Sequence, residues 1–123
     1  MTIGEAMALV DRLTANQISG ADKLAWLSGL DASLYLSVWK THRMPEDGGF
    51  AGYGPETPPD TGLLAPPPFD EIYRWYLEMQ IHGANGETAR YNAAAEKYNA
   101  ALIAYMDGVN RRYAPLGTRM KWW

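Results

Sequence analysis

The first apolar stripe of the sequence predicts a short amphipathic helix that ends between Leu13 and Asn16. Its apolar residues recur at three- and four-residue spacing: Ile3, Ala6, Met7, Val10 and Leu13. Thr2 and Glu5 stand at the spacing of a capping box, in which each side chain accepts a hydrogen bond from the other residue's backbone N–H. An isolated helix of this length is marginal in water, so we expect it to dock on the rest of the chain.

A second stripe predicts a longer helix from about Gly20 to Thr41. Ser19 is a favourable N-cap, and Asp22 adds negative charge to the first turn. The apolar positions are Leu24, Leu27, Leu30, Leu34 and Val38, widened by Trp26, Tyr35 and Trp39. Gly29 costs about 1 kcal/mol relative to Ala inside a helix, which predicts close packing against another helix there. The charged residues of this helix are interpreted as solvated: Asp22, Lys23, Asp31 and Lys40.

Proline and glycine interrupt the helical pattern between Arg43 and Pro68. Phe50 and Tyr53 flank Ala51-Gly52 and predict one turn of extended or hairpin structure. Long loops inside compact domains are uncommon and are usually functional or disordered. Neither flank is large enough for a comfortable domain, so we interpret residues 43–66 as a loop that protrudes or becomes ordered on assembly. A linker between two domains is the alternative.

A third helix is predicted to start at Pro66–Pro68, because proline is tolerated in a first turn, and Asp70-Glu71 favours a helix N-terminus. Its apolar residues cover nearly every side: Ile72, Tyr73, Trp75, Tyr76, Leu77, Met79 and Ile81. Such a helix is buried centrally or shared with another subunit. Glycines then break the pattern between Gly83 and Gly86, and we expect Asn85 to cap the next helix.

The last helix is predicted from about Glu87 to Tyr113, where Pro115 and Gly117 follow. Its stripe is Tyr91, Ala94, Tyr98, Ala101, Leu102, Tyr105 and Val109, with the three tyrosines at a strict spacing of seven. A helix of this length spans roughly 40 Å, more than so small a domain needs. Part of it is therefore expected to project or to pack on a neighbour. The tyrosines have two interpretations, as core residues and as a subunit interface.

These elements define one all-α domain over residues 1–123. We expect a small bundle of about four helices, a long Pro/Gly-rich loop between the second and third helices, and a long C-terminal helix. Residues 114–123 form a basic aromatic tail. A length of 123 residues suits a single domain with its own core.

Composition narrows the classes of function. The chain has no cysteine, so it has neither disulfides nor a thiolate site. Its net charge of -3 gives no basic field for nucleic acid phosphates, which argues against sequence-specific nucleic acid binding. No apolar run reaches the ~20 residues of a membrane span, and no signal segment is seen. We therefore expect a non-secreted protein that does not bind membranes.

No pattern in the sequence predicts catalysis. His42 and His82 are the only histidines, and they lack the spacing of a metal site. Asp70 and Glu71 are adjacent on a helix and point about 100° apart, so they do not share a substrate easily. Phosphate loops and nucleophile motifs are absent. We expect no enzyme activity, no catalytic residue, no metal and no cofactor.

Exposed aromatic and arginine residues are the types that anchor protein interfaces. They are most concentrated in the loop, along the last helix and in the tail. The candidate interaction residues are Phe50, Tyr53, Tyr91, Tyr98, Tyr105, Arg112, Trp122 and Trp123.

Several short motifs of this chain resemble those of a group of short proteins that are encoded among the structural genes of prophages in Gram-positive bacteria. They read LLAPPPFDEIY at 63–73, QI at 80–81, ANGE at 84–87 and RYN at 90–92, and the segments 26–31, 41–42 and 50–53 fit as well. The match extends from about Asp22 to Pro115. The group resembles the head–tail connectors, also called head-completion or adaptor proteins, of long-tailed phages.

That resemblance implies an all-helical subunit of an oligomeric ring between portal and tail, through which DNA passes. Its partners would be copies of itself and the portal and tail-side proteins. It would occupy the virion neck after assembly and the host cytoplasm before. The alternative is a small helical interaction or regulatory module with no catalytic role, pairing as a homodimer through the tyrosine heptads.

Overall fold

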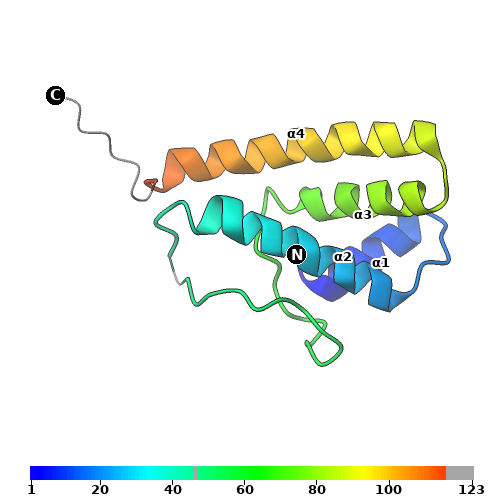
Figure 1. Ribbon diagram of the computed structural model, residues 1–123, viewed down its shortest axis with the longest axis horizontal. Coiled ribbons are helices and arrows are strands. Elements are labelled where there is room, and N and C mark those ends of the chain that lie inside the picture. The colour runs from blue at the N-terminus through cyan, green and yellow to red at the C-terminus, as the bar shows by residue number, and fades with distance from the viewer. Residues whose placement is uncertain (46, 116–123) are drawn as a thin grey trace.

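The computed structural model describes residues 1–45 and 47–115, and these residues form an all-α fold (Figure 1). The helices are α1 (Ile3–Leu13), α2 (Gly20–Leu34), the π-helical turn η1 (Tyr35–Trp39), α3 (Glu71–Ala84) and α4 (Thr88–Arg112). Within the described part of the chain, extended pairing is limited to two isolated bridges, Thr2 with Gly62 and His42 with Pro115. The predicted small helical bundle is confirmed.

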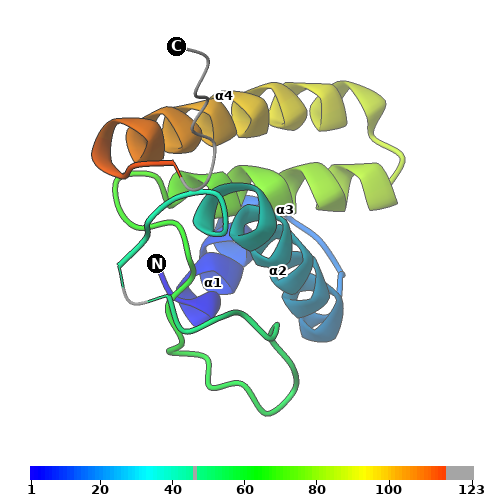
Figure 2. The ribbon, with the colours of Figure 1, turned by 60° about the vertical axis from the view of Figure 1, so that its left-hand side comes forward.

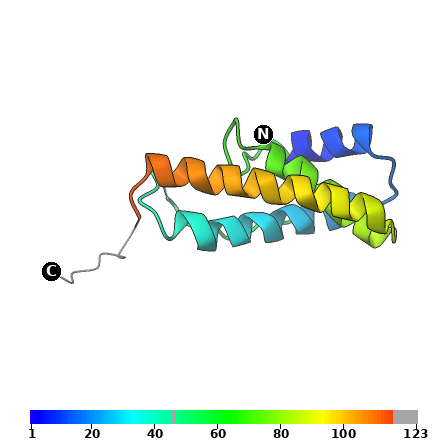
Figure 3. The ribbon, with the colours of Figure 1, turned by 90° about the horizontal axis from the view of Figure 1, so that it is seen from above.

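Helix α3 is the central element. It pairs with α4 in an antiparallel hairpin, and α1 and α2 pack on its other side (Figures 1 and 2). Seen from above, α4 runs along the molecule between α1 and α2 (Figure 3). Ile72, Tyr73, Leu77 and Ile81 of α3 are fully buried, as the nearly all-round apolar pattern predicts.

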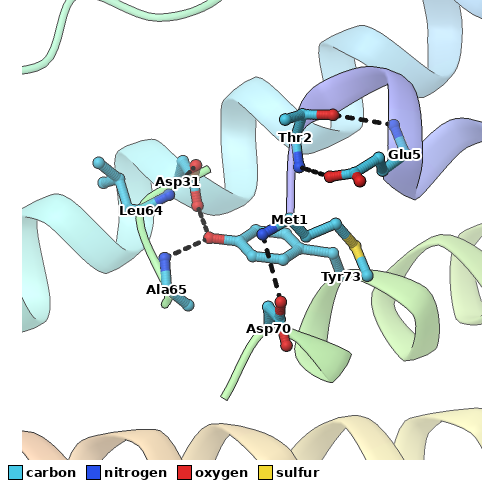
Figure 4. A network of polar contacts seen from close by, with 8 residues as sticks. All are labelled: Met1, Thr2, Glu5, Asp31, Leu64, Ala65, Asp70 and Tyr73. Atoms are coloured by element: carbon cyan, nitrogen blue, oxygen red, sulfur yellow. Dashed lines mark hydrogen bonds and ion pairs between the residues drawn. The ribbon is translucent and has the colours of Figure 1, made fainter. Parts of the chain in front are cut away.

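The predicted start and end of α1 are both confirmed. Thr2 is the N-cap, and its Oγ1 accepts a hydrogen bond from the Glu5 N–H, while Glu5 Oε1 accepts one from the Thr2 N–H (Figure 4). The helix ends at Leu13 because Thr14 takes an extended conformation. Ile3, Ala6 and Val10 form its buried face.

Helix α2 begins at the predicted Ser19 cap but leaves the α-helical form at Leu34. From Tyr35 to Trp39 the turns widen, and the Lys40 N–H bonds to the Tyr35 carbonyl five residues back. The predicted close approach at Gly29 is wrong, because Gly29 is exposed and a Cβ there would meet nothing within 4 Å. The tightest glycine contact among the described residues is at Gly108 of α4, where an added Cβ would lie 2.5 Å from the Phe69 ring.

Segment 43–66 follows an irregular path whose second part is tied to the N-terminus of α1. The N–H groups of Ile3 and Gly4 donate to the carbonyls of Thr61 (3.0 Å) and Pro59 (2.8 Å). These are first-turn donors that the helix itself leaves unsatisfied. Leu63 and Ala65 then enter the core, while the middle of the segment extends below the helices in Figure 1.

The break between α3 and α4 is a Schellman motif. Gly86 adopts the left-handed conformation (φ 73°), the Gly86 N–H donates to the Gly83 carbonyl, and the Glu87 N–H donates to the His82 carbonyl. Asn85 is thus the C-cap of α3, and the prediction that it caps α4 is wrong. Glu87 is the N-cap of α4 and makes no side-chain capping bond.

Helix α4 is longer than its partner α3, and its C-terminal half packs on other parts of the same chain. Tyr105 contacts Phe69, with ring centroids 5.8 Å apart, and its hydroxyl accepts a hydrogen bond from Trp39 Nε1 at the end of η1. The segment that precedes α3 and the end of η1 therefore cover this half of α4. Its length alone does not require a neighbouring molecule.

Candidate interaction site

A buried carboxylate joins three parts of the fold. Asp31 of α2 is 0% exposed and accepts hydrogen bonds from the Tyr73 hydroxyl (2.6 Å), the Tyr53 hydroxyl (2.5 Å) and the Leu64 N–H (3.0 Å). The Tyr73 hydroxyl in turn accepts a bond from the Ala65 N–H (Figure 4). The interpretation of Asp31 as a solvated charge is wrong, because donors from the loop and from α3 replace its water.

Burial dominates the titration of this cluster. It raises the pKa of the Asp31 carboxyl above its ordinary value, although the three donated hydrogen bonds oppose that shift. Burial and the neighbouring carboxylate raise the pKa values of Tyr53 and Tyr73 as well. Both hydroxyls therefore stay protonated and remain donors at neutral pH.

Lys23 is the second charge that the structure buries. It is 4% exposed, and its Nζ donates to Asp11 Oδ1 (2.6 Å) and to the Ile18 carbonyl (2.9 Å). The bond to Lys23 lowers the pKa of the Asp11 carboxyl. Lys23 therefore holds the connection between α1 and α2, and its interpretation as a solvated side chain is wrong.

The two aromatic residues of the loop fold back on α2 and η1. Phe50 stacks on Tyr35 with centroids 6.2 Å apart and meets the edge of Tyr53 at 5.1 Å. The Tyr53 N–H also donates to the Ser28 hydroxyl (3.0 Å). Phe50 and Tyr53 are both partly exposed, so they remain candidates for a partner contact while they anchor the loop.

The three heptad-spaced tyrosines of α4 differ in environment. Tyr91 is 38% exposed, whereas Tyr105 is 1% exposed and its hydroxyl accepts a bond from Trp39 Nε1 (3.0 Å). Tyr98 is partly buried against Tyr76, with centroids 5.2 Å apart. A straight helix drifts by about 20° per heptad, which turns successive members of the series toward the core. In this conformation only Tyr91 and part of Tyr98 face a potential partner.

The remaining candidates are Arg112, Trp122 and Trp123, in the C-terminal part of the chain. Arg112 is exposed at the end of α4 and lines a cavity of about 230 Å³ beside Trp39 and Phe69. Trp122 and Trp123 lie outside the described residues. Contacts of all these residues with a partner stay a prediction.

Several exposed apolar side chains were not among the sequence candidates. They are Leu36 (65% exposed), Ile103 (59%), Leu13 (47%) and Met106 (38%). Ile103 and Met106 lie on α4 away from its buried stripe. An apolar residue off the stripe of an amphipathic helix is the signal that would have found them.

The histidines and acidic residues take part in structural contacts. His42 lies within 2.7 Å of Asn110 Oδ1, and His82 Nδ1 lies 2.9 Å from Glu87 Oε1 beside a hollow of about 230 Å³. The bond to His82 lowers the pKa of Glu87. Asp70 binds the amino group of Met1 at 3.2 Å (Figure 4). Among residues 1–45 and 47–115, no three His, Cys, Asp or Glu side chains converge as metal ligands would.

None of the helices in the described part of the chain combines the length and the apolar character needed to cross a membrane. Comparison with protein-family models, with curated proteins and with solved structures gives no match.

Proposed function

We propose that this protein is a structural subunit of a phage head–tail connector, which forms an oligomeric ring between portal and tail. The observation that carries the proposal is the resemblance over residues 63–92, together with the structural use of those residues. The 63–73 motif supplies two of the groups around Asp31, Leu64 and Tyr73, and the 84–87 motif supplies the Schellman turn. The first motif therefore joins the start of α3 and the loop before it to α2, and the second forms the turn of the α3–α4 hairpin.

Surface composition supports an assembling subunit. Ile103, Met106 and Tyr91 expose apolar area on α4, and the Phe50/Tyr53 turn exposes more on the loop. The buried cores of subunit interfaces are enriched in apolar and aromatic side chains of this kind. The net charge of -3 suits a channel that DNA crosses without adhering. The proposed partners are further copies of the chain and the portal and tail-side proteins, with no sequence-specific nucleic acid contact and no membrane.

In this role the protein has no enzyme activity and needs no cofactor. It resides in the host cytoplasm before assembly and in the virion neck afterwards. The alternative, a homodimeric interaction module pairing through the tyrosine heptads, has less support. Two of the three tyrosines, Tyr98 and Tyr105, contact side chains of their own chain.

Native mass spectrometry of the protein alone and mixed with the portal protein of the same phage tests the proposal. We expect a complex with portal that contains several copies of this chain, and electron microscopy should show a ring. A chain that stays monomeric in the presence of portal would contradict the connector role. A dimer whose mass is independent of concentration and of portal would support the alternative.

A further inference from the structure

A groove of about 750 Å³ lies between α1, α2 and the 53–59 part of the loop. Volumes of this size are typical of binding pockets. Small residues make up part of its helical walls, Gly4 and Ala8 on α1 and Gly20, Ala21 and Ala25 on α2. The larger residues Ile3, Met7, Asp11 and Leu24 complete those walls. Tyr53, Pro55 and Pro59 form the opposite side. The groove can therefore hold large side chains that this part of the fold does not itself provide.

Acidic residues lie in the groove lining and next to it in the sequence. Asp11 is a lining residue, and the exposed residues Asp22, Glu56 and Asp60 each follow a lining residue. Among the described residues Asp11 pairs with Lys23, and no ion pair involves the other three acids. The lining is thus mostly apolar, and the residues that adjoin it in the sequence add negative charge. A partner segment with large apolar side chains and positive charges would complement it.

Residues 119–123 of this chain have that chemistry. The segment reads Arg-Met-Lys-Trp-Trp, which combines two indoles and a thioether with two cations. Trp and Arg are the residue types most enriched where binding energy concentrates in protein interfaces. These residues lie outside the described part of the chain.

We propose that the groove between α1, α2 and the loop binds residues 119–123 of a second copy of this chain. The side chains of Trp122 and Trp123 fill the groove, and Arg119 and Lys121 face the acidic residues around it. The inference deepens the proposed function, because it rests on self-assembly and names the contact that joins the copies.

A chain's own tail does not reach the far end of its groove. The Ala114 carbonyl accepts a hydrogen bond from the Arg43 N–H. The C-terminal end of α4, which precedes Ala114, lies at the opposite end of the molecule from the start of α2 (Figures 1 and 3). The axis from Ala21 to Trp39 alone covers about 27 Å at the helical rise. Seven residues from Pro115 to Trp122 span at most about 25 Å when fully extended. A tail that occupies the groove along its whole length, including the part at Ala21, therefore comes from a neighbouring copy.

Such a contact joins two different surfaces, the tail of one copy and the groove of the next. A head-to-tail interface of this kind is repeated from copy to copy and closes into a ring when the rotation allows it. A single tail–groove contact thus gives the cyclic arrangement that the connector role requires, without a two-fold dimer.

The test uses a fluorescently labelled peptide of residues 116–123 and the full-length chain with Trp122→Ala and Trp123→Ala, whose own tails cannot compete. Anisotropy titration should show saturable binding. Adding Ala21→Arg, which fills the groove and repels the cations, should weaken binding by about tenfold or more. The matched control is Ala89→Arg, at the same second position of α4, which should leave binding unchanged. Circular dichroism verifies that each variant folds.

Full-length variants extend the test to assembly. The Ala21→Arg chain keeps its tail, and the Trp122→Ala/Trp123→Ala chain keeps its groove, so we expect neither to form a ring alone. Mixed together they should give one-to-one dimers and nothing larger, because each pair has one intact contact.

Three results would overturn the tail–groove contact. They are peptide binding that Ala21→Arg does not weaken, equal binding of a peptide that lacks both indoles, and normal rings from the Trp122→Ala/Trp123→Ala chain. The last result would leave the connector role standing. A chain that binds the peptide in its groove but never assembles with portal would separate the two proposals in the other direction. The tail–groove contact would then exist, and the connector role would be contradicted.

Discussion

The hydroxyl of Tyr73 on α3 donates a 2.6 Å hydrogen bond to the buried carboxylate of Asp31 on α2, although 42 positions separate the two residues. The same carboxylate accepts bonds from Tyr53 and Leu64. Asp31 therefore connects the helical bundle with both the middle and the end of the long loop. In the described part of the chain no buried side-chain polar atom lacks a partner, so these bonds complete the polar contacts of the core.

We expect Asp31→Ala to be among the most damaging single substitutions. It leaves two tyrosine hydroxyls and one backbone N–H without an acceptor in a buried site, at about 1–3 kcal/mol for each unsatisfied group. The free energy of unfolding should fall by about 3 kcal/mol or more. Urea unfolding followed by circular dichroism measures it. The control is Asp107→Ala, an exposed acid on α4, which should change stability by less than about 0.5 kcal/mol. Equal effects of the two substitutions would contradict the role of Asp31.

The raised pKa of Asp31 should determine how its contribution to the free energy of unfolding changes with pH. Because burial raises the pKa of Asp31 in the folded state, the folded chain holds this proton more tightly than the unfolded chain. Its contribution is fully present below the unfolded value of about 3.9 and is lost as pH rises through the folded value. The free energy of unfolding of the wild type minus that of Asp31→Asn should therefore decrease as pH rises above about 4.

Urea unfolding of both chains at a series of pH values between about 4 and 8 measures that difference. Using Asp31→Asn as the reference removes the titration of every other carboxyl group, provided that those groups are unchanged. A stability difference that increases with pH would mean that the three hydrogen bonds outweigh burial.

Local signals in the sequence determined how much of the fold could be predicted. The ends of α1 follow from Thr2 and Glu5, and the start of α2 follows from Ser19, because a cap depends on residues within one turn. The central position of α3 follows from its apolar faces. The Schellman turn at Gly86 was also within reach, since a glycine one residue past the last helical turn is its usual signature.

The burial of Asp31 and Lys23 could not be predicted in the same way. Each looks like a solvated helix charge because its partners come from elsewhere: Tyr53 and Tyr73 for Asp31, and Asp11 for Lys23. The same limit applies to the candidate interaction residues. Whether Tyr105 faces the core or a neighbour depends on where Trp39 and Phe69 lie, and the period of α4 does not contain that information.

Two glycine substitutions should have opposite effects. Gly29 is exposed in the interior of α2 with free space around its Cβ position, so Gly29→Ala should raise stability by about 0.5–1 kcal/mol. Gly86 requires a left-handed backbone, so Gly86→Ala should lower stability by about 1 kcal/mol or more. Thermal unfolding of both variants beside the wild type measures the two shifts. A loss of stability in Gly29→Ala would mean that this position has a packing role that its open surroundings do not indicate.

Because the ammonium of Lys23 is buried, substitutions at the two ends of its ion pair with Asp11 should destabilise the fold to different extents. Asp11→Asn removes the negative charge and leaves the ammonium of Lys23, 4% exposed, with only uncharged acceptors, the new amide oxygen and the Ile18 carbonyl. Removing one charge of a buried pair is destabilising because the other charge is left uncompensated. Lys23→Met removes the charge itself and keeps an apolar stem of similar length, and apolar replacement of a buried ion is often nearly neutral. We therefore expect Asp11→Asn to be the more destabilising of the two in urea unfolding at pH 7, and the double variant to be no worse than Lys23→Met alone. If Lys23→Met costs more than Asp11→Asn, the ion pair contributes net stability at the junction of α1 and α2 and the buried charge is well compensated.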